Sequence, residues 1–146
     1  MPTEIPMKQA SLLVVEDDDI DAKGIERAFK KLKVANPIYR VKDGLEALAL
    51  LRGEAGLTAL EKPYIILLDL NMPRMSGIEF LEAIRHDSTL YDTIVFVLTT
   101  SKADQDRTAA YKNNVAGYIV KSDVQHGFYN VLDLIDNYWK IVELPT

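Results

Sequence analysis

Residues 64–81 read YIILLDLNMPRMSGIEFL, and this stretch decides the fold. It begins with a continuous apolar run, Tyr64–Leu68, which is typical of a strand buried on both faces of a parallel sheet. The run ends at Asp69, and a short loop then leads into Gly77–Arg85, where apolar side chains recur at helical spacing. The stretch therefore predicts a buried strand, a carboxylate at its carboxyl end and a following helix.

The same alternation of strand and helix extends over the rest of the chain. Further apolar, β-branched runs predict strands at Leu12–Val15, Ile38–Val41, Ile94–Leu98 and Gly117–Val120. Helical spacing predicts further helices at Asp19–Leu32, Gly44–Leu51, Lys102–Asn113 and Val124–Val142. Five strands in strict alternation with five helices predict an α/β fold, a doubly wound parallel sheet with helices on both faces.

Length and composition limit the remaining possibilities. A chain of 146 residues, 48% of them hydrophobic, suits one domain with a real core, which we expect at residues 11–142, between a flexible tail at 1–10 and a short tail at 143–146. The net charge of −5 argues against a nucleic-acid partner, and no cysteine is present to form a disulfide or a thiolate metal site. The strand-like apolar runs reach only five residues, against the ~18 of a membrane helix, and no signal pattern opens the chain, so we expect a soluble cytoplasmic protein.

Polar residues directly follow four of the predicted strands. They are Glu16, Asp17 and Asp18 after the first strand, Asp69 after the third, Thr99 and Thr100 after the fourth, and Lys121 after the fifth. Because the carboxyl ends of parallel strands meet at one edge of a sheet, we expect these side chains to gather there. Taken singly they have ordinary explanations: the acidic run can cap a helix, as we expect of Asp18 and Asp19, and Lys121 can be a solvated surface residue.

Together these residues suit a site of phosphoryl transfer. Carboxylates placed side by side repel one another unless a cation lies among them, and Mg²⁺ prefers such oxygen ligands. A carboxylate can accept a phosphoryl group, and a metal ion can offset the charge of the transferred group. A lysine at the end of the fifth strand can hold an anion, and a threonine hydroxyl at the end of the fourth can donate to a phosphate oxygen. The pattern predicts Mg²⁺-dependent phosphorylation of Asp69.

The stretches LLVVEDD (12–18), IILLDLNMPRMSGIEFL (65–81), VFVLTTS (95–101) and GYIVK (117–121) resemble the receiver domain of bacterial two-component response regulators. The resemblance covers about residues 11–140, and its most specific part places Pro73 four residues and Gly77 eight residues after Asp69. Within the family, LTTSKAD at 98–104 and the late Tyr138-Trp139 pair resemble small stand-alone regulators linked to bacterial phytochrome-type kinases.

The resemblance implies a single-domain response regulator with a flavodoxin-like fold and strand order 2-1-3-4-5, and it implies a role for each matched residue. Asp69 would be the phosphoacceptor, Asp17 a direct Mg²⁺ ligand, Glu16 part of the acidic pocket through a water molecule and Asn71 a ligand through its backbone carbonyl, while Thr99, Lys121 and Tyr118 would bind the phosphoryl group or report the switch. A sensor histidine kinase or a histidine phosphotransfer protein would donate the phosphoryl group, and an unknown downstream protein would receive the output. The chain would not be an enzyme apart from its own phosphoryl uptake and autodephosphorylation.

Two positions depart from the family pattern. Family members usually carry a proline after the lysine of the fifth strand, often through a cis bond, whereas Ser122 follows Lys121 here. A cis bond without proline costs about 2.5–4 kcal/mol, so this loop is either trans or strained. The turn before that strand usually carries glycine, and here it reads NNVAG at 113–117, where Asn113 or Asn114 can adopt the left-handed conformation that ends a helix.

Other functions fit the sequence less well. Haloacid-dehalogenase-type phosphatases place the acceptor aspartate after the first strand with an acid two residues on, whereas Asp69 follows the third strand and Asn71 stands two residues on. A flavin or nucleotide site would need a glycine- or serine-rich loop after the first strand, where the acidic run would repel phosphate. A receiver-like scaffold that is never phosphorylated stays open because of Ser122.

The last predicted helix carries more apolar surface than contact with the sheet requires. One stripe should cover the sheet, and it consists of Val124, Phe128, Val131, Leu132, Ile135, Trp139 and Val142. A second row lies beside this stripe and consists of Leu134, Tyr138 and Ile141, with Asp133, Asp136, Asn137, Lys140 and Glu143 on the opposite side. Either neighbouring helices cover the second row or it meets a partner, most simply a second copy about a two-fold axis.

Overall fold

The computed structural model describes residues 9–124 and 127–146. Its strands are β1 (Ser11–Val15), β2 (Ile38–Val41), β3 (Tyr64–Leu68), β4 (Ile94–Thr99) and β5 (Gly117–Val120). Its helices are α1 (Asp19–Lys31), α2 (Gly44–Arg52), α3 (Gly77–Arg85), α4 (Asp104–Lys112) and α5 (Tyr129–Ile141), with a 3₁₀ turn, η1, at Lys121–Asp123. Neighbouring strands are parallel and their order is β2-β1-β3-β4-β5, so the doubly wound sheet and its strand order are confirmed.

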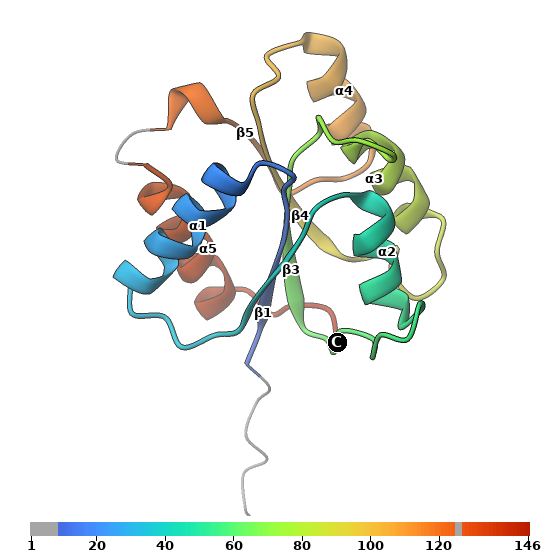
Figure 1. The fold of residues 1–146 in the computed structure, drawn as a ribbon, viewed down its shortest axis with the longest axis horizontal. Helices are drawn as coiled ribbons and strands as arrows, with labels where there is room; N and C mark the ends of the chain where they lie inside the picture. The colour runs from blue at the N-terminus through green and yellow to red at the C-terminus, as the bar shows by residue number, and fades with distance from the viewer. Residues whose placement is uncertain (1–8, 125–126) are drawn as a thin grey trace, which may run out of the picture.

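Helices cover both faces of the sheet, α1 and α5 on one side and α2, α3 and α4 on the other (Figure 1). Successive residues of a strand point to opposite faces, so the apolar residues of β1 serve both layers. Leu12 and Val14 pack in the layer of α1 and α5, whereas Leu13 and Val15 pack in the layer of α2 and α3. The continuous apolar runs therefore reflect burial on two faces.

Helix α4 begins later than predicted and ends close to the predicted residue. It begins at Asp104 instead of Lys102, because the hydroxyl of Ser101 accepts a hydrogen bond from the N–H of Ala103 (3.3 Å) and holds these residues as a loop. After the helix, Asn114 has a φ of 58°, so an asparagine takes the left-handed conformation at this helix end, as predicted.

Helix α5 begins at Tyr129, and the prediction that it starts at Val124 is wrong. The 3₁₀ turn η1 comes first, and Val124 is extended, with φ −83° and ψ 127°. Gly127 has a φ of 62°, which a right-handed helix excludes, while residues 125 and 126 of the predicted helix lie outside the described residues. Apolar residues continue at helical spacing back to Val124, but the backbone conformation of this segment prevents a helix from forming there.

The second apolar row of α5 is only partly exposed. The ring of Tyr138 packs edge-to-face against Phe96 of β4, with ring centroids 5.2 Å apart, so the sheet layer covers this member of the row. Leu134 and Ile141 are 47% and 82% exposed. Val142, assigned to the stripe on the sheet, is exposed as well, because it follows the last turn of the helix.

Residues of both predicted tails, 1–10 and 143–146, pack as part of the folded unit. Ala10 is buried, and its carbonyl accepts a hydrogen bond from the side-chain amide of Asn36 (2.8 Å). Leu144 packs against the layer of α1 and α5. Residues 1–8 of the predicted N-terminal tail lie outside the described residues. Within the described part of the chain, no helix has the length and apolar character needed to cross a membrane.

Candidate functional site

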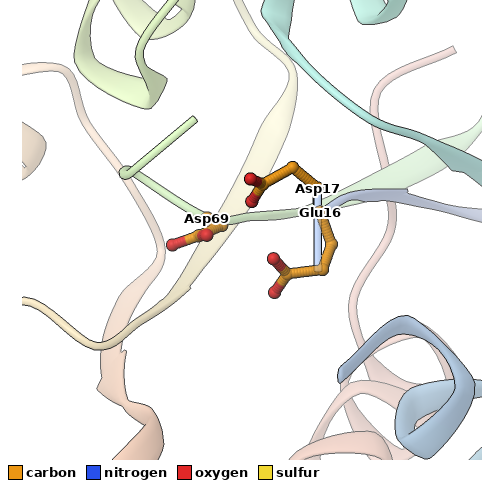
Figure 2. A group of neighbouring side chains, drawn as sticks. All are labelled: Glu16, Asp17 and Asp69. Atoms are coloured by element: carbon orange, nitrogen blue, oxygen red, sulfur yellow. The ribbon is translucent and has the colours of Figure 1, made fainter. Parts of the chain in front are cut away.

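The predicted acidic residues lie together at the carboxyl ends of β1 and β3. These strands are neighbours, and the pairing of Val15 with Leu68 aligns their ends. Glu16 and Asp17 follow β1 and Asp69 follows β3, so that one carboxylate oxygen of each lies within 4.8 Å of the others (Figure 2). The N–H of Asp69 donates to the carbonyl of Val15 (3.0 Å). The sheet itself therefore fixes the backbone that carries the cluster.

The acidic cluster has the donor set of a divalent metal site. Glu16 and Asp69 are 2% and 6% exposed, whereas Asp17 is exposed to solvent. Burial raises the pKa of Glu16 to about 7, and the charge of Asp69 acts in the same direction, although the hydrogen bond with Lys121 opposes them. Carboxylates this close repel one another unless a cation lies among them, and Mg²⁺ prefers oxygen ligands. The residues present therefore fit a hard divalent cation.

The ammonium group of Lys121 lies among these carboxylates. Its Nζ is 2.5 Å from Oε1 of Glu16, 2.8 Å from Oδ2 of Asp21 and 3.8 Å from Oδ2 of Asp69. Burial alone would lower the pKa of Lys121, but the hydrogen bonds with Asp21 and Glu16 and the charge of Asp69 outweigh burial, so the pKa lies above its ordinary value. Lys121 is therefore a fixed positive charge beside Asp69.

The surroundings of Lys121 settle the geometry of its bond to Ser122 and bring one further carboxylate, that of Asp21, into the site. The bond from Lys121 to Ser122 is trans, since the cis bond in the described part of the chain joins Lys62 to Pro63. Asp21, in the first turn of α1, had no predicted role, because acids at that position ordinarily complement the helix dipole. Asp21 does not directly follow a strand, so the sequence pattern offers no signal for its contact with Lys121.

Arg40 of β2 holds the loop that carries the acidic residues. Its Nε donates to the backbone carbonyl of Glu16 (2.8 Å), and its Nη1 donates to Oδ1 of Asp19 (2.8 Å). Asp18 caps α1, as predicted, and Asp19 is the first residue of the helix. Asp19 is thus engaged by Arg40 and stays outside the cluster that Glu16 forms with its neighbours.

The predicted switch residues form a connected group on the side of β4 and β5. Thr99 is the fully buried last residue of β4, and its hydroxyl accepts a hydrogen bond from the N–H of Ser101 (3.3 Å). The hydroxyl of Tyr118 donates to the carbonyl of Ser101 (3.0 Å). The guanidinium of Arg107 in α4 lies 5.8 Å from the centre of the Tyr118 ring. The loop after Thr99 therefore connects the acidic end of the sheet to β5 and α4.

The loop after Asp69 explains why glycine stands eight residues after this aspartate. The N–H of Asn71 donates to Oδ1 of Asp69 (3.4 Å), and its side-chain amide donates to the hydroxyl of Thr100 (3.3 Å). The N–H of Gly77 donates to the carbonyl of Leu70 (2.9 Å), and a Cβ at Gly77 would lie 2.6 Å from the carbonyl oxygen of Asp69. Only glycine lets α3 begin this close to the strand end.

A parallel sheet of this strand order, with an acid pair after β1, an aspartate after β3 and a lysine after β5, defines the class of response regulator receiver domains. Residues 12–128 match the family described as the response regulator receiver domain. The chain belongs to this family.

Individual relatives support the same class over nearly the whole chain. Response regulator Rcp1 of Synechocystis sp. PCC 6803 is 32% identical over 136 residues, which are 92% of this chain and 92% of Rcp1. The structure of Mn²⁺-bound Rcp1 is similar with a TM-score of 0.83 and 31% identity, covering 94% of this chain and 99% of Rcp1. The structure of the phosphorylated cyanobacterial phytochrome response regulator RcpA is similar with a TM-score of 0.85 and 34% identity, covering 95% of this chain and 100% of RcpA.

Family membership decides between the function classes that the sequence left open. The chain is a receiver domain that acts in phosphorylation-dependent signalling, and it is not a classical enzyme of the phosphatase type. Receiver domains interact with histidine kinases or phosphotransfer proteins, and they bind Mg²⁺ or Mn²⁺ at an acidic site. The cluster of Glu16, Asp17 and Asp69 is consistent with such a site.

Proposed function

We propose that Asp69 accepts a phosphoryl group from a phosphohistidine of a sensor histidine kinase or a histidine phosphotransfer protein. The observation that carries the proposal is the position of Asp69, buried at the end of β3 with other carboxylates beside it and Nζ of Lys121 3.8 Å away. An oxygen of Asp69 forms the new bond to phosphorus while the N–P bond of the donor breaks, and its electron pair leaves on the imidazole nitrogen. Water that attacks the phosphorus later releases inorganic phosphate and returns the carboxylate.

Asp17, Asp69 and the backbone carbonyl of Asn71 would hold Mg²⁺, and Glu16 would complete the acidic pocket through a water molecule. The bound ion would supply positive charge for the oxygens of the transferred phosphoryl group. The mutual approach of the three carboxylates within 4.8 Å supports this assignment, and so does the similarity to Rcp1, whose structure holds Mn²⁺. Lys121 adds a permanent positive charge beside Asp69, with its Nζ 3.8 Å from Oδ2.

Thr99, Lys121 and Tyr118 would report the phosphorylated state. The hydroxyl of Thr99 would turn from the N–H of Ser101 toward a phosphoryl oxygen, and Lys121 would pair with another. Because Tyr118 holds the carbonyl of Ser101, a movement of this loop reaches β5 and α4. Ala110 is the buried residue of α4, so little core packing opposes a shift of that helix. The altered surface would bind the downstream protein.

The proposed phosphoryl uptake is tested with acetyl phosphate, a small donor that needs no partner protein. We expect the wild-type protein to gain the mass of one phosphoryl group in Mg²⁺ and to gain none after chelation of the metal, as measured by intact-mass spectrometry. Equal labelling with and without Mg²⁺ would contradict the metal assignment. For the protein donor, a phytochrome-type sensor kinase is the first candidate, because RcpA, 34% identical to this chain, is a phytochrome response regulator.

We propose a second copy of the chain as the partner of the exposed part of α5. Leu134 and Ile141 lie seven residues apart, on one side of the helix, and both are exposed. We expect light scattering at tens of micromolar protein to detect a dimer that the Leu134→Glu/Ile141→Glu double variant loses. Leu57→Glu, at an exposed leucine in the loop before β3, is the matched control. A wild-type protein that is monomeric with and without beryllofluoride would refute the dimer.

A further inference from the structure

The ammonium group of Lys121 is held by two carboxylates that come from different elements. Its Nζ donates to Oε1 of Glu16 (2.5 Å), at the end of β1, and to Oδ2 of Asp21 (2.8 Å), in the first turn of α1. The side chains of Lys121 and Asp21 are 10% and 29% exposed, so their contact is partly shielded from water. An ammonium group has three N–H donors. Two are used by these carboxylates, and the third remains for the side of Asp69, whose Oδ2 is 3.8 Å away.

Lys121 needs such partners because lysine is long and flexible, and its direction depends on the groups that hold it. The backbone at Lys121 forms only the three-residue turn η1, Lys121–Asp123, which does not by itself fix the direction of the lysine side chain. Asp21 belongs to a helix of 13 residues, and its own N–H donates to the capping carboxylate of Asp18 (3.0 Å). Helix α1 therefore presents the carboxylate of Asp21 from a fixed position.

We infer that Asp21 is a positioning residue of the phosphorylated state. It holds the ammonium group of Lys121 so that the remaining N–H faces an oxygen of the phosphoryl group on Asp69. Asp21 acts through Lys121 and lies outside the cluster proposed to hold the metal. The inference rests on the proposed function of Asp69, and it assigns to helix α1 the support of a lysine that is followed here by Ser122.

Beryllofluoride, which takes the place of a phosphoryl group on a carboxylate, provides the test in saturating Mg²⁺. We expect Asp21→Ala to weaken beryllofluoride binding about ten-fold, the size of a lost hydrogen bond between charged groups. The fluorine-19 resonance of the bound fluorine that contacts Lys121 should shift, while the affinity for Mg²⁺ alone should stay within about two-fold of wild type. Asp21→Glu, which keeps the carboxylate, should restore part of the binding.

A double-mutant cycle separates positioning from a merely structural role. If Asp21 acts through Lys121, the Asp21→Ala/Lys121→Ala variant binds beryllofluoride no more weakly than Lys121→Ala alone. Glu26→Ala removes an exposed carboxylate from the same helix and should bind like the wild type. Fully additive losses, or wild-type binding by Asp21→Ala, would overturn the inference while Asp69 keeps its proposed role. Failure of the wild-type protein to bind beryllofluoride would overturn the role of Asp69 and the inference with it.

Discussion

Replacement of Asp69 by asparagine should abolish phosphoryl uptake and leave the fold intact. Asparagine has nearly the same shape, but its neutral amide lacks the anionic oxygen that attacks phosphorus. The substitution also removes a negative charge from a buried cluster in which the pKa of Glu16 is already raised to about 7. We therefore expect the free energy of unfolding to stay unchanged or to rise. Intact-mass spectrometry with acetyl phosphate and Mg²⁺ measures the uptake, and thermal melting of the same samples measures stability.

The matched control for this substitution is Asp92→Asn. Asp92 is exposed and lies just before β4, at the edge of the sheet opposite to Asp69, where Nζ of Lys62 is 3.8 Å from its carboxylate. This variant should take up phosphoryl like the wild type. Wild-type labelling of Asp69→Asn would mean that another side chain is the acceptor, and Asp17 is the first to examine.

The local pattern of apolar residues was sufficient to predict the strands, the helices and their layers, but it could not predict the order of the strands in the sheet. The apolar runs at 64–68 and 94–98 became β3 and β4 with at most one residue of difference, because a strand buried on both faces leaves an unbroken run of apolar residues. Strand order depends on pairing between residues distant in the chain, which no local period records. The resemblance to receiver domains supplied it, and the connectivity of the sheet confirmed it.

The predicted start of α5 and the predicted exposure of Asp136 were wrong, because a backbone angle and side-chain hydrogen bonds decide these features and the pattern of polar and apolar residues does not show them. Val124 continues the helical period, but the positive φ of Gly127 prevents a helix from running through that segment. Asp136 lies on the polar side by period, yet it is buried, since it accepts hydrogen bonds from the indole N–H of Trp139 (3.0 Å) and from Nζ of Lys140 (2.8 Å). A hydrophobic period records side-chain polarity and carries no information about such partners.

The sequence was sufficient to predict those residues of the candidate site that directly follow a strand. The parallel sheet brings Glu16, Asp17 and Asp69 together because each follows a strand directly. Asp21 does not follow a strand, and it meets Lys121 across a separation of 100 residues. An acid in the first turn of a helix already has an ordinary explanation in the helix dipole. Sequence alone therefore had no reason to assign Asp21 a partner.

Replacement of Asp17 by alanine should weaken Mg²⁺ binding about ten-fold or more, because the proposed site loses a charged oxygen ligand. Asp17 is the exposed member of the acidic cluster, so the substitution should cost little stability. Asp19→Ala removes the same charge two residues on, but Asp19 pairs with Arg40 (2.8 Å) outside the cluster. Its affinity for Mg²⁺ should therefore stay within about two-fold of the wild type.

Calorimetric titration of Mg²⁺ into both variants at two salt concentrations separates coordination by Asp17 from a general effect of charge. A lost ligand weakens binding at every salt concentration, since contact between an oxygen and the ion excludes screening. A general effect of charge fades with salt, because at about 0.15 M ionic strength exposed charges are screened over roughly 8 Å. Losses that are equal in Asp17→Ala and Asp19→Ala and that disappear at high salt would mean that net charge attracts the ion and that Asp17 is not its ligand.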